Sequence, residues 1–522
     1  MSISFLSIKN LSFSYPSSIN PVFTDLTVTF PKGWTAIAGA NGGGKTTLLK
    51  ILAGDFTPDG GIITPQSSAL YCEQNSDIPP HDLEEILWSG DGSLRKFFSL
   101  LHIEDEQIYR WETLSGGEKK RIQVASALAA SPEILMLDEP TNHLDSESGE
   151  IILNALLQYD GIGLVVSHDR SFTDRLCSNS FFLKNGTGKM YPGGLTATLE
   201  LQQNENKSRF NSWRDAQNEV KKNKKTVQTW TAEAIHSENR KSKKRIDPKD
   251  HDAQSKIDLA RLSGKDRIAG DAKSRFHTRL SQSEQRLDAL KKPEFRKTGI
   301  SISSGTAAGK TVFTCEEQDL YAGEYCLHIP ELCVAQNDRI ALTGSNGSGK
   351  TTLIHFILDS LREKAAGDTG KEFLFFNLPQ GILYLPQEIP ENEERKILAA
   401  FKKMDNAEQG AVLSVLYRLG SEPKALLNIR EDADTGNTSL LSPGELRKLL
   451  IALALYMPVN FIIMDEPTNH MDITSILAIE TALRDISCAL LMVSHDQAFL
   501  DNLTGTEWHI ERNGRQGQLQ IL

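Results

Sequence analysis

The stretch Gly39-Ala-Asn-Gly-Gly-Gly-Lys-Thr-Thr47 decides how this chain folds. It fits G-x-x-x-x-G-K-[ST], the pattern of a phosphate-binding loop. The apolar residues 34–38 before it are typical of a strand, and residues 46–52 after it are typical of a helix. Glycines let successive backbone N–H groups point inward, and the start of the helix adds partial positive charge. We therefore expect Lys45 to reach the phosphates of a nucleotide and Thr46 to hold Mg²⁺.

A Gly-rich turn that binds nothing is the alternative, but the same loop returns as Gly344-Ser-Asn-Gly-Ser-Gly-Lys-Thr-Thr352. Lys45 matches Lys350 at a spacing of 305 residues, and Gln74 matches Gln387 at a spacing of 313. Three more motifs repeat at a spacing of 327: Leu-Ser-Gly-Gly-Glu118 with Leu-Ser-Pro-Gly-Glu445, residues 137–145 with 464–472, and residues 166–169 with 493–496. Five motifs that occur twice in the same order indicate two copies of one domain.

These motifs resemble those of ABC ATPases. The sequence Glu-Pro-Thr-Asn-His-Leu/Met-Asp in both halves, with no membrane domain, resembles the ABC-F family in particular. The resemblance covers nearly the whole chain. It implies an α/β fold with two ABC-type P-loop ATPase domains, each with a mixed-sheet core, an antiparallel β-subdomain and a helical subdomain. Residues 1–30, which alternate apolar and polar in places, fit that β-subdomain. ABC-F proteins are soluble twin ATPases, and many act on the ribosome.

Each copy places two adjacent carboxylates at the end of a short apolar run, where α/β sheets place their ligands. Burying unpaired charge is costly, so a structural role alone explains these pairs poorly. By the resemblance, Asp138 and Asp465 hold Mg²⁺, while Glu139 and Glu466 orient and activate the attacking water. In the same way His168 and His495, each within a Ser-His-Asp sequence after an apolar strand, contact the γ-phosphate.

Two further assignments depend on the order of the motifs. Gln74 and Gln387 are expected to touch Mg²⁺ and the attacking water, although a lone Gln is usually polar surface. Tyr15 is expected to stack on adenine, with a place in the strand core as the alternative. In the second copy Leu320 stands at the matching position and Tyr321 beside it, so the second adenine contact stays open.

The stretch Leu-Ser-Gly-Gly-Glu118 opens a helix with a Ser-x-x-Glu capping box. The resemblance implies that the N-terminus of this helix meets the γ-phosphate of ATP bound to the other domain. In the second copy Pro443 replaces the first Gly. Proline suits the first helical position but removes one backbone donor, which puts hydrolysis at the first site in question.

Two composite ATP sites follow from the resemblance. Site one combines Lys45, Asp138, Glu139 and His168 with Ser442 and Gly444, and site two combines Lys350, Asp465, Glu466 and His495 with Ser115 and Gly117. The implied metal ligands are Thr46, Asp138, Gln74, Thr351, Asp465 and Gln387. The implied nucleotide-binding residues are Tyr15, Gly39, Asn41, Gly42, Gly43, Gly44, Lys45, Thr46, Thr47, Ser115, Gly116, Gly117, Glu118, Gly344, Asn346, Gly347, Ser348, Gly349, Lys350, Thr351, Thr352, Ser442, Gly444 and Glu445.

Residues 199–298 form the segment between domain 1 (residues 1–198) and domain 2 (residues 299–522), and they lack every ATPase motif. Within them, Phe210, Trp213, Val220, Val227 and Trp230, and later Phe276, Leu280, Leu287 and Leu290, follow the a/d spacing of an antiparallel two-helix coiled coil. Pro248 and Gly264 are expected to break the helices near the tip. The position of this segment between the two ATPase domains in the sequence resembles that of the linker with which ABC-F proteins contact P-site tRNA in the ribosomal E site.

The charge is distributed unevenly. Residues 200–297 contain 25 Lys and Arg against 15 Asp and Glu, which is a net charge of +10. The whole chain carries −11, so the remainder carries −21. A basic run is usually a solvated face, but a basic hairpin on an acidic body favours phosphate binding. Together with this charge, the resemblance to ABC-F proteins implies that the linker binds ribosomal RNA and P-site tRNA.

Composition excludes several other classes. The longest apolar runs are too short to span a membrane, and the N-terminus has no signal-peptide pattern. The six cysteines are scattered without a C-x-x-C, so neither a zinc nor an iron–sulfur site is supported. We expect a cytoplasmic monomer with ATP and Mg²⁺ as cofactors. As alternatives, a membrane-importer ATPase leaves the basic linker unexplained, and a DNA-repair ATPase usually carries its coiled coil or zinc module inside the ATPase domain.

Overall fold

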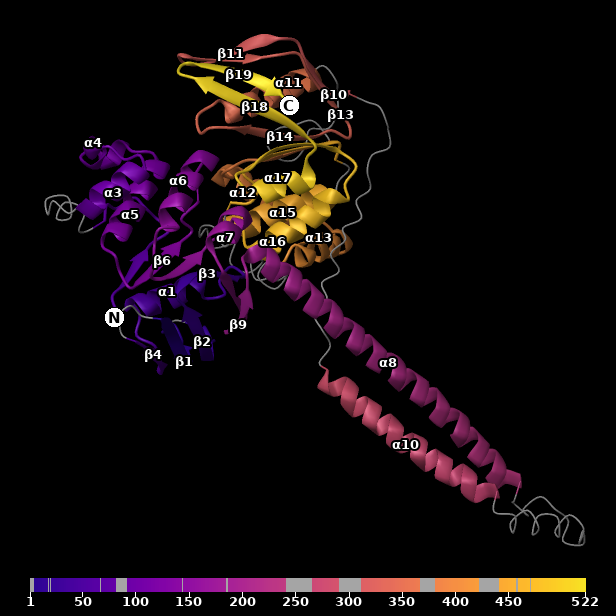
Figure 1. The fold of residues 1–522 in the computed structure, drawn as a ribbon. Coiled ribbons are helices and arrows are strands. Elements are labelled where there is room, and N and C mark those ends of the chain that lie inside the picture. The colour runs from indigo at the N-terminus through magenta and orange to yellow at the C-terminus, as the bar shows by residue number, and fades with distance from the viewer. Residues whose placement is uncertain are drawn as a thin grey trace, which may run out of the picture. The chain divides into compact units, whose positions relative to one another are not determined.

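The computed structural model describes all residues except 1–3, 17, 19, 66, 81–91, 143, 185, 241–264, 291–310, 367–380, 422–440, 457–458 and 470. The chain forms two compact units, which are coloured along the sequence in Figure 1. One unit contains Met1–Thr198 and Lys297–Leu522, and therefore both copies of the repeat. The other unit is Leu199–Arg296.

The first copy is built on a mixed sheet. Its described strands follow the order β5-β6-β7-β3-β8-β9. β3 pairs in parallel with β7 and β8, whereas β9 is antiparallel to β8. The bounds of these strands are Gly33–Gly39 for β3, Ala69–Cys72 for β5, Ile134–Asp138 for β6, Ile162–Val166 for β7, Asn179–Lys184 for β8 and Thr187–Pro192 for β9.

Both faces of this sheet are covered, which explains why its central strands are continuously apolar. Along β3, Ile37 packs in one cluster with Leu48 of α1 (Lys45–Ala53). Ala36 and Ala38 pack in another cluster with Ile122 of α5 (Gly116–Ala129). A second described sheet, β2-β1-β4, is antiparallel throughout and confirms the expected β-subdomain. Its strands are β1 (Phe5–Phe13), β2 (Phe23–Pro31) and β4 (Gly60–Thr64).

The second copy repeats this plan with one difference. Its described main sheet follows the order β11-β12-β19-β18-β14-β17-β16-β15. β12 pairs in parallel with β19, so the β11–β12 hairpin joins the main sheet, and β10 pairs separately with β13. The strands are β10 (Thr311–Cys315), β11 (Gln318–Ala322), β12 (Tyr325–Ile329), β13 (Leu332–Ala335), β14 (Arg339–Gly344), β15 (Ile382–Leu385), β16 (Phe461–Asp465), β17 (Ala489–Val493), β18 (Thr506–Asn513) and β19 (Gln516–Ile521).

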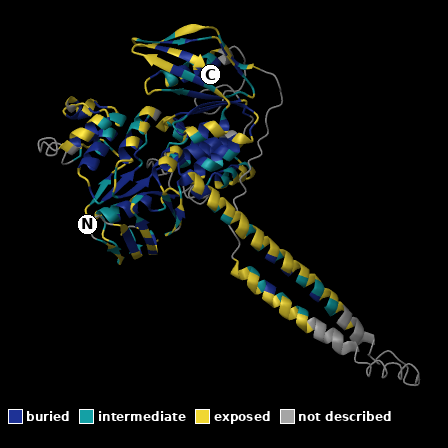
Figure 2. Cartoon of the chain, in the orientation of Figure 1, coloured by how far each residue is buried: buried dark blue, intermediate teal, exposed yellow. Residues whose placement is uncertain are grey.

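Helices pack around both sheets, and several of them begin within a motif or directly after one. Figure 2 shows both buried and exposed residues on these helices. In the first copy they are α1 (Lys45–Ala53), α3 (Gly92–Leu100), α4 (Asp105–Ile108), the 3₁₀ turn η1 (Trp111–Thr113), α5 (Gly116–Ala129), α6 (Ser146–Leu156) and α7 (Arg170–Leu176). In the second copy they are α11 (Lys350–Ala366), α12 (Glu391–Lys403), α13 (Asn406–Arg418), α15 (Pro443–Tyr456), α16 (Ile473–Arg484) and α17 (Gln497–Leu503).

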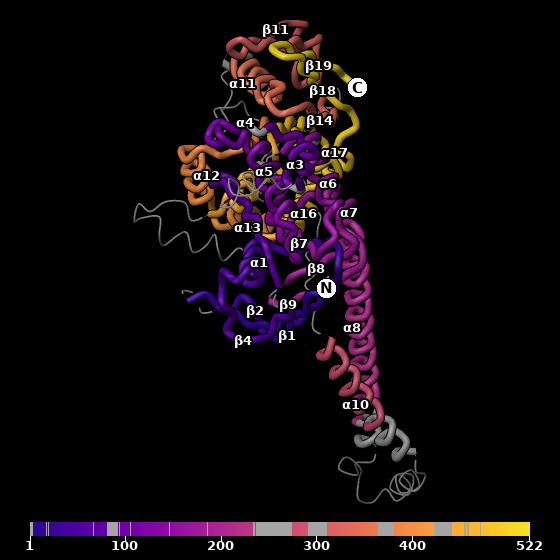
Figure 3. The backbone as a smooth tube through the Cα atoms, turned by 60° about the vertical axis from the view of Figure 1, so that its left-hand side comes forward, coloured from indigo at the N-terminus to yellow at the C-terminus, as the bar shows by residue number. Residues whose placement is uncertain are grey.

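The second unit is a helical hairpin of α8 (Leu195–Arg240) and α10 (Lys265–Ala289), which run side by side in Figures 1 and 3. Three cross-contacts fix an antiparallel register: Glu219 with Arg286, Asn223 with Ser283, and Trp230 stacked on Phe276 with ring centroids 6.0 Å apart. Pro248 and Gly264 lie outside the described residues. None of the helices in the described part of the chain is long and apolar enough to cross a membrane.

Candidate composite nucleotide sites

Both P-loops join a strand to a helix through glycines with positive φ, a conformation that other residues rarely adopt. Gly44 caps α1 with φ of +93°, and a Cβ atom there would lie 2.7 Å from Val22 Cγ1. The lysines of both loops lie back along the backbone. Lys45 Nζ donates to the carbonyl oxygens of Gly39 (2.9 Å) and Ala40 (3.1 Å), and Lys350 Nζ donates to that of Gly344 at 2.6 Å. The loops thus concentrate backbone N–H groups and one cation at the start of a helix.

Two of the three expected metal ligands, the threonine and the aspartate, lie together in each copy. Thr46 Oγ1 donates to Asp138 Oδ2 at 2.7 Å, and Tyr71 Oη donates to the same oxygen at 3.1 Å. Thr351 Oγ1 reaches Asp465 Oδ2 at 3.4 Å. The described residues contain no cluster of three or more His, Cys, Asp or Glu side chains suited to a metal. A hydroxyl and one carboxylate nevertheless fit Mg²⁺, which is usually held by one or two carboxylates together with substrate phosphates and water.

The two glutamates that follow Asp138 and Asp465 have an unusual backbone conformation. Glu139 and Glu466 have φ of +46° and +50°, and their N–H groups donate to the carbonyls of Val166 and Val493. Positive φ is costly for a side chain other than glycine and is found preferentially at functional sites. This conformation turns each carboxylate toward a histidine. The Nε2–Oε1 distances are 3.4 Å for His168 and Glu139 and 3.3 Å for His495 and Glu466.

Burial controls the protonation of these groups. It raises the pKa of Glu139 to about 8, with the charge of Asp138 adding to the rise. It also raises the pKa of Glu466 to about 7, with the charge of Asp465 adding to the rise. Burial and the Lys45 ammonium lower the pKa of His168 to about 3. At neutral pH a neutral imidazole therefore faces a carboxyl group poised to gain or lose a proton. Carboxyl groups of this kind serve as general bases in many active sites.

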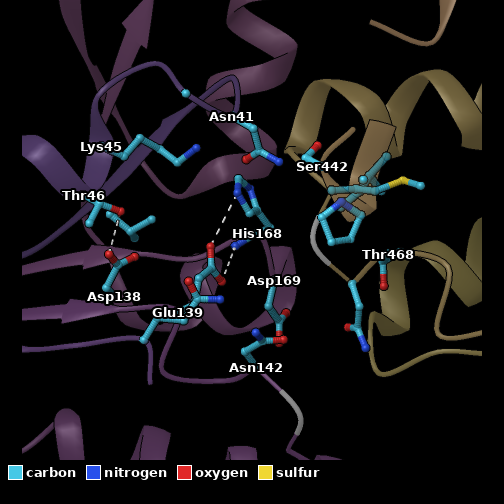
Figure 4. Close-up of a pocket in the computed structure, with 18 of the residues that line it drawn as sticks. Asn41, Lys45, Thr46, Asp138, Glu139, Asn142, His168, Asp169, Ser442 and Thr468 are labelled. Atoms are coloured by element: carbon cyan, nitrogen blue, oxygen red, sulfur yellow. Dashed lines mark hydrogen bonds and ion pairs between the residues drawn. The ribbon is translucent and has the colours of Figure 1, made fainter. Parts of the chain in front are cut away.

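The first P-loop faces the second copy across a pocket of about 550 Å³ (Figure 4). Ser442, Pro443 and Gly444 line its far side. On the near side, Thr46 lies against Asp138 and His168 points toward Glu139. The residues of the sequence analysis that line this pocket are Tyr15, Asn41, Gly42, Gly44, Lys45, Thr46, Thr47, Gln74, Asp138, Glu139, His168, Ser442, Gly444 and His495.

The two helices that carry the Leu-Ser motifs are capped by their serines. Ser115 and Glu118 form the expected capping box of α5, and Ser442 Oγ accepts from the N–H of Glu445 at the start of α15. Pro443 is the first residue of α15. Gly117 packs against Leu144.

The structure also places the remaining residues of the two P-loops and Gln387. Ser348 is buried, and Gly347 and Gly349 have positive φ. Thr352 lies in the first turn of α11, and Gln387 follows β15. Gly43 in the first loop donates its N–H to the carbonyl of Ala40.

Each P-loop has one hydrogen bond to the other copy that was not predicted from the sequence. The N–H of Asn41 donates to Asp472 Oδ2 at 3.0 Å, and the N–H of Asn346 donates to Asp145 Oδ2 at 3.4 Å. Each aspartate also caps a helix, α16 or α6. Asp145 and Asp472 end the Glu-Pro-Thr-Asn-His motifs, so their repetition was the signal that could have identified them.

Two buried cations that were also not predicted, Lys120 and Arg447, bind the backbone of the segments that contain Gln74 and Gln387. Lys120 Nζ donates to the carbonyls of Glu73 (2.7 Å) and Gln74 (3.3 Å). Arg447, 327 residues later, donates to the carbonyls of Gln387, Glu466 and Asn469. Both cations are buried. Because a basic residue occurs at this matching position in both copies, the repeat could have identified Lys120 and Arg447 from the sequence.

Tyr15 lines the pocket but is also tied to its own domain. Its ring packs edge-on against Phe13 and Phe56, and its hydroxyl lies 2.8 Å from Thr47 Oγ1. In the second copy Tyr321 is exposed, whereas Tyr325 donates its hydroxyl to the carbonyl of Ser348 at 2.6 Å. The aromatic side chain that contacts the second P-loop is therefore Tyr325, which the sequence analysis did not name.

Comparison with known proteins decides the family. A family model described as "ABC transporter" matches residues 23–142 and 327–469, which are the two copies. The chain belongs to the ABC transporter family. It is 27% identical to the ATP-binding protein Uup of Haemophilus influenzae, over 92% of this chain and 74% of Uup. It is 26% identical to the ribosome protection protein VmlR of Bacillus subtilis (97% and 87% covered) and 26% identical to the tylosin resistance ATP-binding protein TlrC of Streptomyces fradiae (97% of each covered).

These relatives confirm the resemblance to ABC-F proteins, and with it the ATPase assignment. Among solved structures, the archaeal ribosome recycling factor aABCE1 in complex with the ribosomal stalk protein aP1 aligns with a TM-score of 0.58 and 18% identity. That alignment covers 98% of this ABC-F chain and 89% of aABCE1. It confirms the twin ATPase fold.

Proposed function

We propose that this ABC-F ATPase acts on ribosomes in the cytoplasm, as a translation factor or as a ribosome protection factor. ATP and Mg²⁺ bind in two composite sites, the two domains close on them, and the linker of residues 199–298 contacts tRNA and ribosomal RNA. The observation that carries the ribosomal part is the helical hairpin between the ATPase domains, in a segment with a net charge of +10. The name of VmlR, a ribosome protection protein, supports it.

In this proposal each residue of the first site has its own role in the transfer of the γ-phosphoryl group to water. Lys45 neutralises phosphate charge, and the N-terminus of α15 presents N–H groups to the γ-phosphate from the other domain. Glu139 takes the proton of the attacking water, and its raised pKa makes it a stronger base. His168 stays neutral and holds the orientation of Glu139. Mg²⁺, held by Thr46, Asp138 and Gln74, supplies charge stabilisation when bound.

Asp465, Glu466, His495 and Gln387 have the same roles at site two, and Ser115 and Gly117 close that site in the proposal. Hydrolysis at either site removes the γ-phosphate that holds the two domains together. The nucleotide then acts as a switch that releases the linker from its RNA partner.

Ribosome co-sedimentation of the double variant Glu139→Gln, Glu466→Gln tests this proposal. Blocked hydrolysis should keep the domains closed, so we expect ATP-dependent binding to ribosomes that weakens as salt is raised. The matched control adds Lys45→Met and Lys350→Met, which should abolish the ATP dependence. Absence of ribosome binding at low and at moderate salt would contradict the ribosomal role and leave the ATPase assignment intact.

The linker is tested separately through its described surface. Lys221 and Lys225 are exposed on α8. If the hairpin binds RNA, replacing both with Gln should weaken ribosome binding and lower its salt dependence by about one per lost phosphate contact. Glu219→Gln on the same helix serves as the control for a change that removes no positive charge.

A further inference from the structure

A buried ion cluster joins the two ATPase domains at one point. Arg170 is the first residue of α7 in domain 1, and its Nη1 lies 3.1 Å from Glu480 Oε2 on α16 of domain 2. Its Nη2 donates to Asp496 Oδ2, the cap of α17, at 3.4 Å. All three side chains are at most 7% exposed. Because a buried charge without its partner is strongly unfavourable, these groups hold the two domains together at this point.

Domain 2 completes the cluster from its own side. Asn502 Nδ2 donates to Glu480 Oε1 at 2.5 Å, and Arg484 Nη2 donates to the same oxygen at 3.4 Å. Burial raises the pKa of both acids, while the Arg170 guanidinium lowers it. The guanidinium of Arg170 therefore favours the charged form of both carboxylates.

The residues at the matching positions of the repeat do not form a second cluster of this kind. At the spacing of 327 residues, Arg170 corresponds to Gln497 and Glu480 corresponds to Leu153. Gln497 bonds to Asp501 on its own helix, and Leu153 is buried in the apolar core of domain 1. The shared domain fold therefore does not require this contact, and the two halves of the molecule differ here.

Its position links the two proposed catalytic glutamates. Arg170 lies two residues after His168, whose imidazole contacts Glu139. Asp496 follows His495, whose imidazole contacts Glu466. The contact between Arg170 and Asp496 thus ties together the two loops that carry these histidines.

We propose that Arg170 is a positioning residue that couples the two ATP sites, so that nucleotide at one site raises the affinity of the other. This inference rests on the two ATP sites of the proposed function and is independent of the ribosome. The coupling requires a pair of loops that move together, and the buried guanidinium supplies the connection.

The test is equilibrium binding of a non-hydrolysable ATP analogue with Mg²⁺ to the unmodified protein and to Arg170→Gln, which introduces the residue found at the matching position. We expect two analogues per chain in both proteins. The Hill coefficient should exceed about 1.5 in the unmodified protein and fall to about 1 in the variant. Arg175→Gln, on the same helix but in an exposed ion pair with Glu150, should keep the original coefficient.

A second variant distinguishes a loss of coupling between the sites from a failure of Arg170→Gln to fold. Arg170→Met with Glu480→Leu replaces the ion pair by apolar side chains, which maintains packing while still removing the contact with Asp496. It should still bind two analogues per chain, which shows that it is folded, with a Hill coefficient of about 1. Equal coefficients in the unmodified protein and both variants would overturn the proposal, as would a coefficient of 1 in the unmodified protein. A protein that binds no analogue would overturn the ATP sites as well.

Discussion

At the scale of single residues, the chemistry of the site depends on groups whose protonation is set by burial. Burial and Lys45 lower the pKa of His168 from 6.5 to about 3. Between these values the unfolded chain binds more protons than the folded chain, so the free energy of unfolding falls as the pH is lowered from 6.5 toward 3. The slope for one such group approaches about 1.4 kcal/mol per pH unit.

His168→Gln should remove this contribution. Between pH 6.5 and 5, we expect the unmodified protein to lose about 1.5 kcal/mol more than the variant in urea denaturation. His277→Gln, at an exposed position on α10, should behave like the unmodified protein. If the variant and the unmodified protein lose stability in parallel, His168 is not held neutral by its surroundings.

A second prediction at this scale concerns Arg447, which joins the Gln387 segment to the end of β16. Arg447→Met would leave buried carbonyl groups without donors and release Gln387. In a Glu139→Gln background, where only site two hydrolyses ATP, we expect phosphate release to fall by about tenfold or more, since small displacements of a catalytic group are costly. Arg447→Lys, which copies Lys120 of the first domain, should recover part of the rate. Equal rates for Met and Arg would exclude the positioning role.

At the scale of elements, the difference between α5 and α15 predicts unequal ATP sites. Each helix begins after a capping serine, but α15 begins with Pro443, which has no N–H to offer the γ-phosphate. A missing donor to a developing negative charge commonly costs about a hundredfold in rate. Site one should therefore hydrolyse more slowly than site two.

Exchanging the two residues tests this directly. In a Glu466→Gln background, Pro443→Gly should raise phosphate release by at least about tenfold. In a Glu139→Gln background, Gly116→Pro should lower it by a similar factor, and α5 should tolerate proline because a Cβ at Gly116 meets no neighbour. Rates that do not respond to either exchange would show that this N–H plays no part in hydrolysis.

The elements around the motifs were predictable because their signals are local. The P-loops, the apolar strands that end in Asp-Glu and the capping box of α5 each depend on residues close in sequence, and the structure contains them. The alternation of Ile37 with Ala36 and Ala38 also follows from a sheet covered on both faces. The pairing of β12 with β19 was not predictable, because it joins strands nearly 200 residues apart through contacts that leave no local pattern.

At the scale of the whole molecule, the unpredicted features are the contacts between the two copies. Asn41 and Asp472 are 431 residues apart in the chain, and Arg170 and Asp496 are 326 apart. Neither a helical nor a strand period relates such positions. Their partners are set by how the two domains pack, and a buried arginine in a short helix has the same local sequence signal as an exposed one.

Those contacts predict that the protein is a monomer with and without ATP. Each P-loop already has a partner aspartate within the same chain, Asp472 for Asn41 and Asp145 for Asn346, so a second chain is not needed to complete either site. Sedimentation velocity of the Glu139→Gln, Glu466→Gln variant should give a species near 57.8 kDa in both conditions. With ATP its sedimentation coefficient should rise slightly at constant mass, because closure makes it more compact. The same variant with Lys45→Met and Lys350→Met should show no rise, and a doubling of mass that requires ATP would place the composite sites between chains instead.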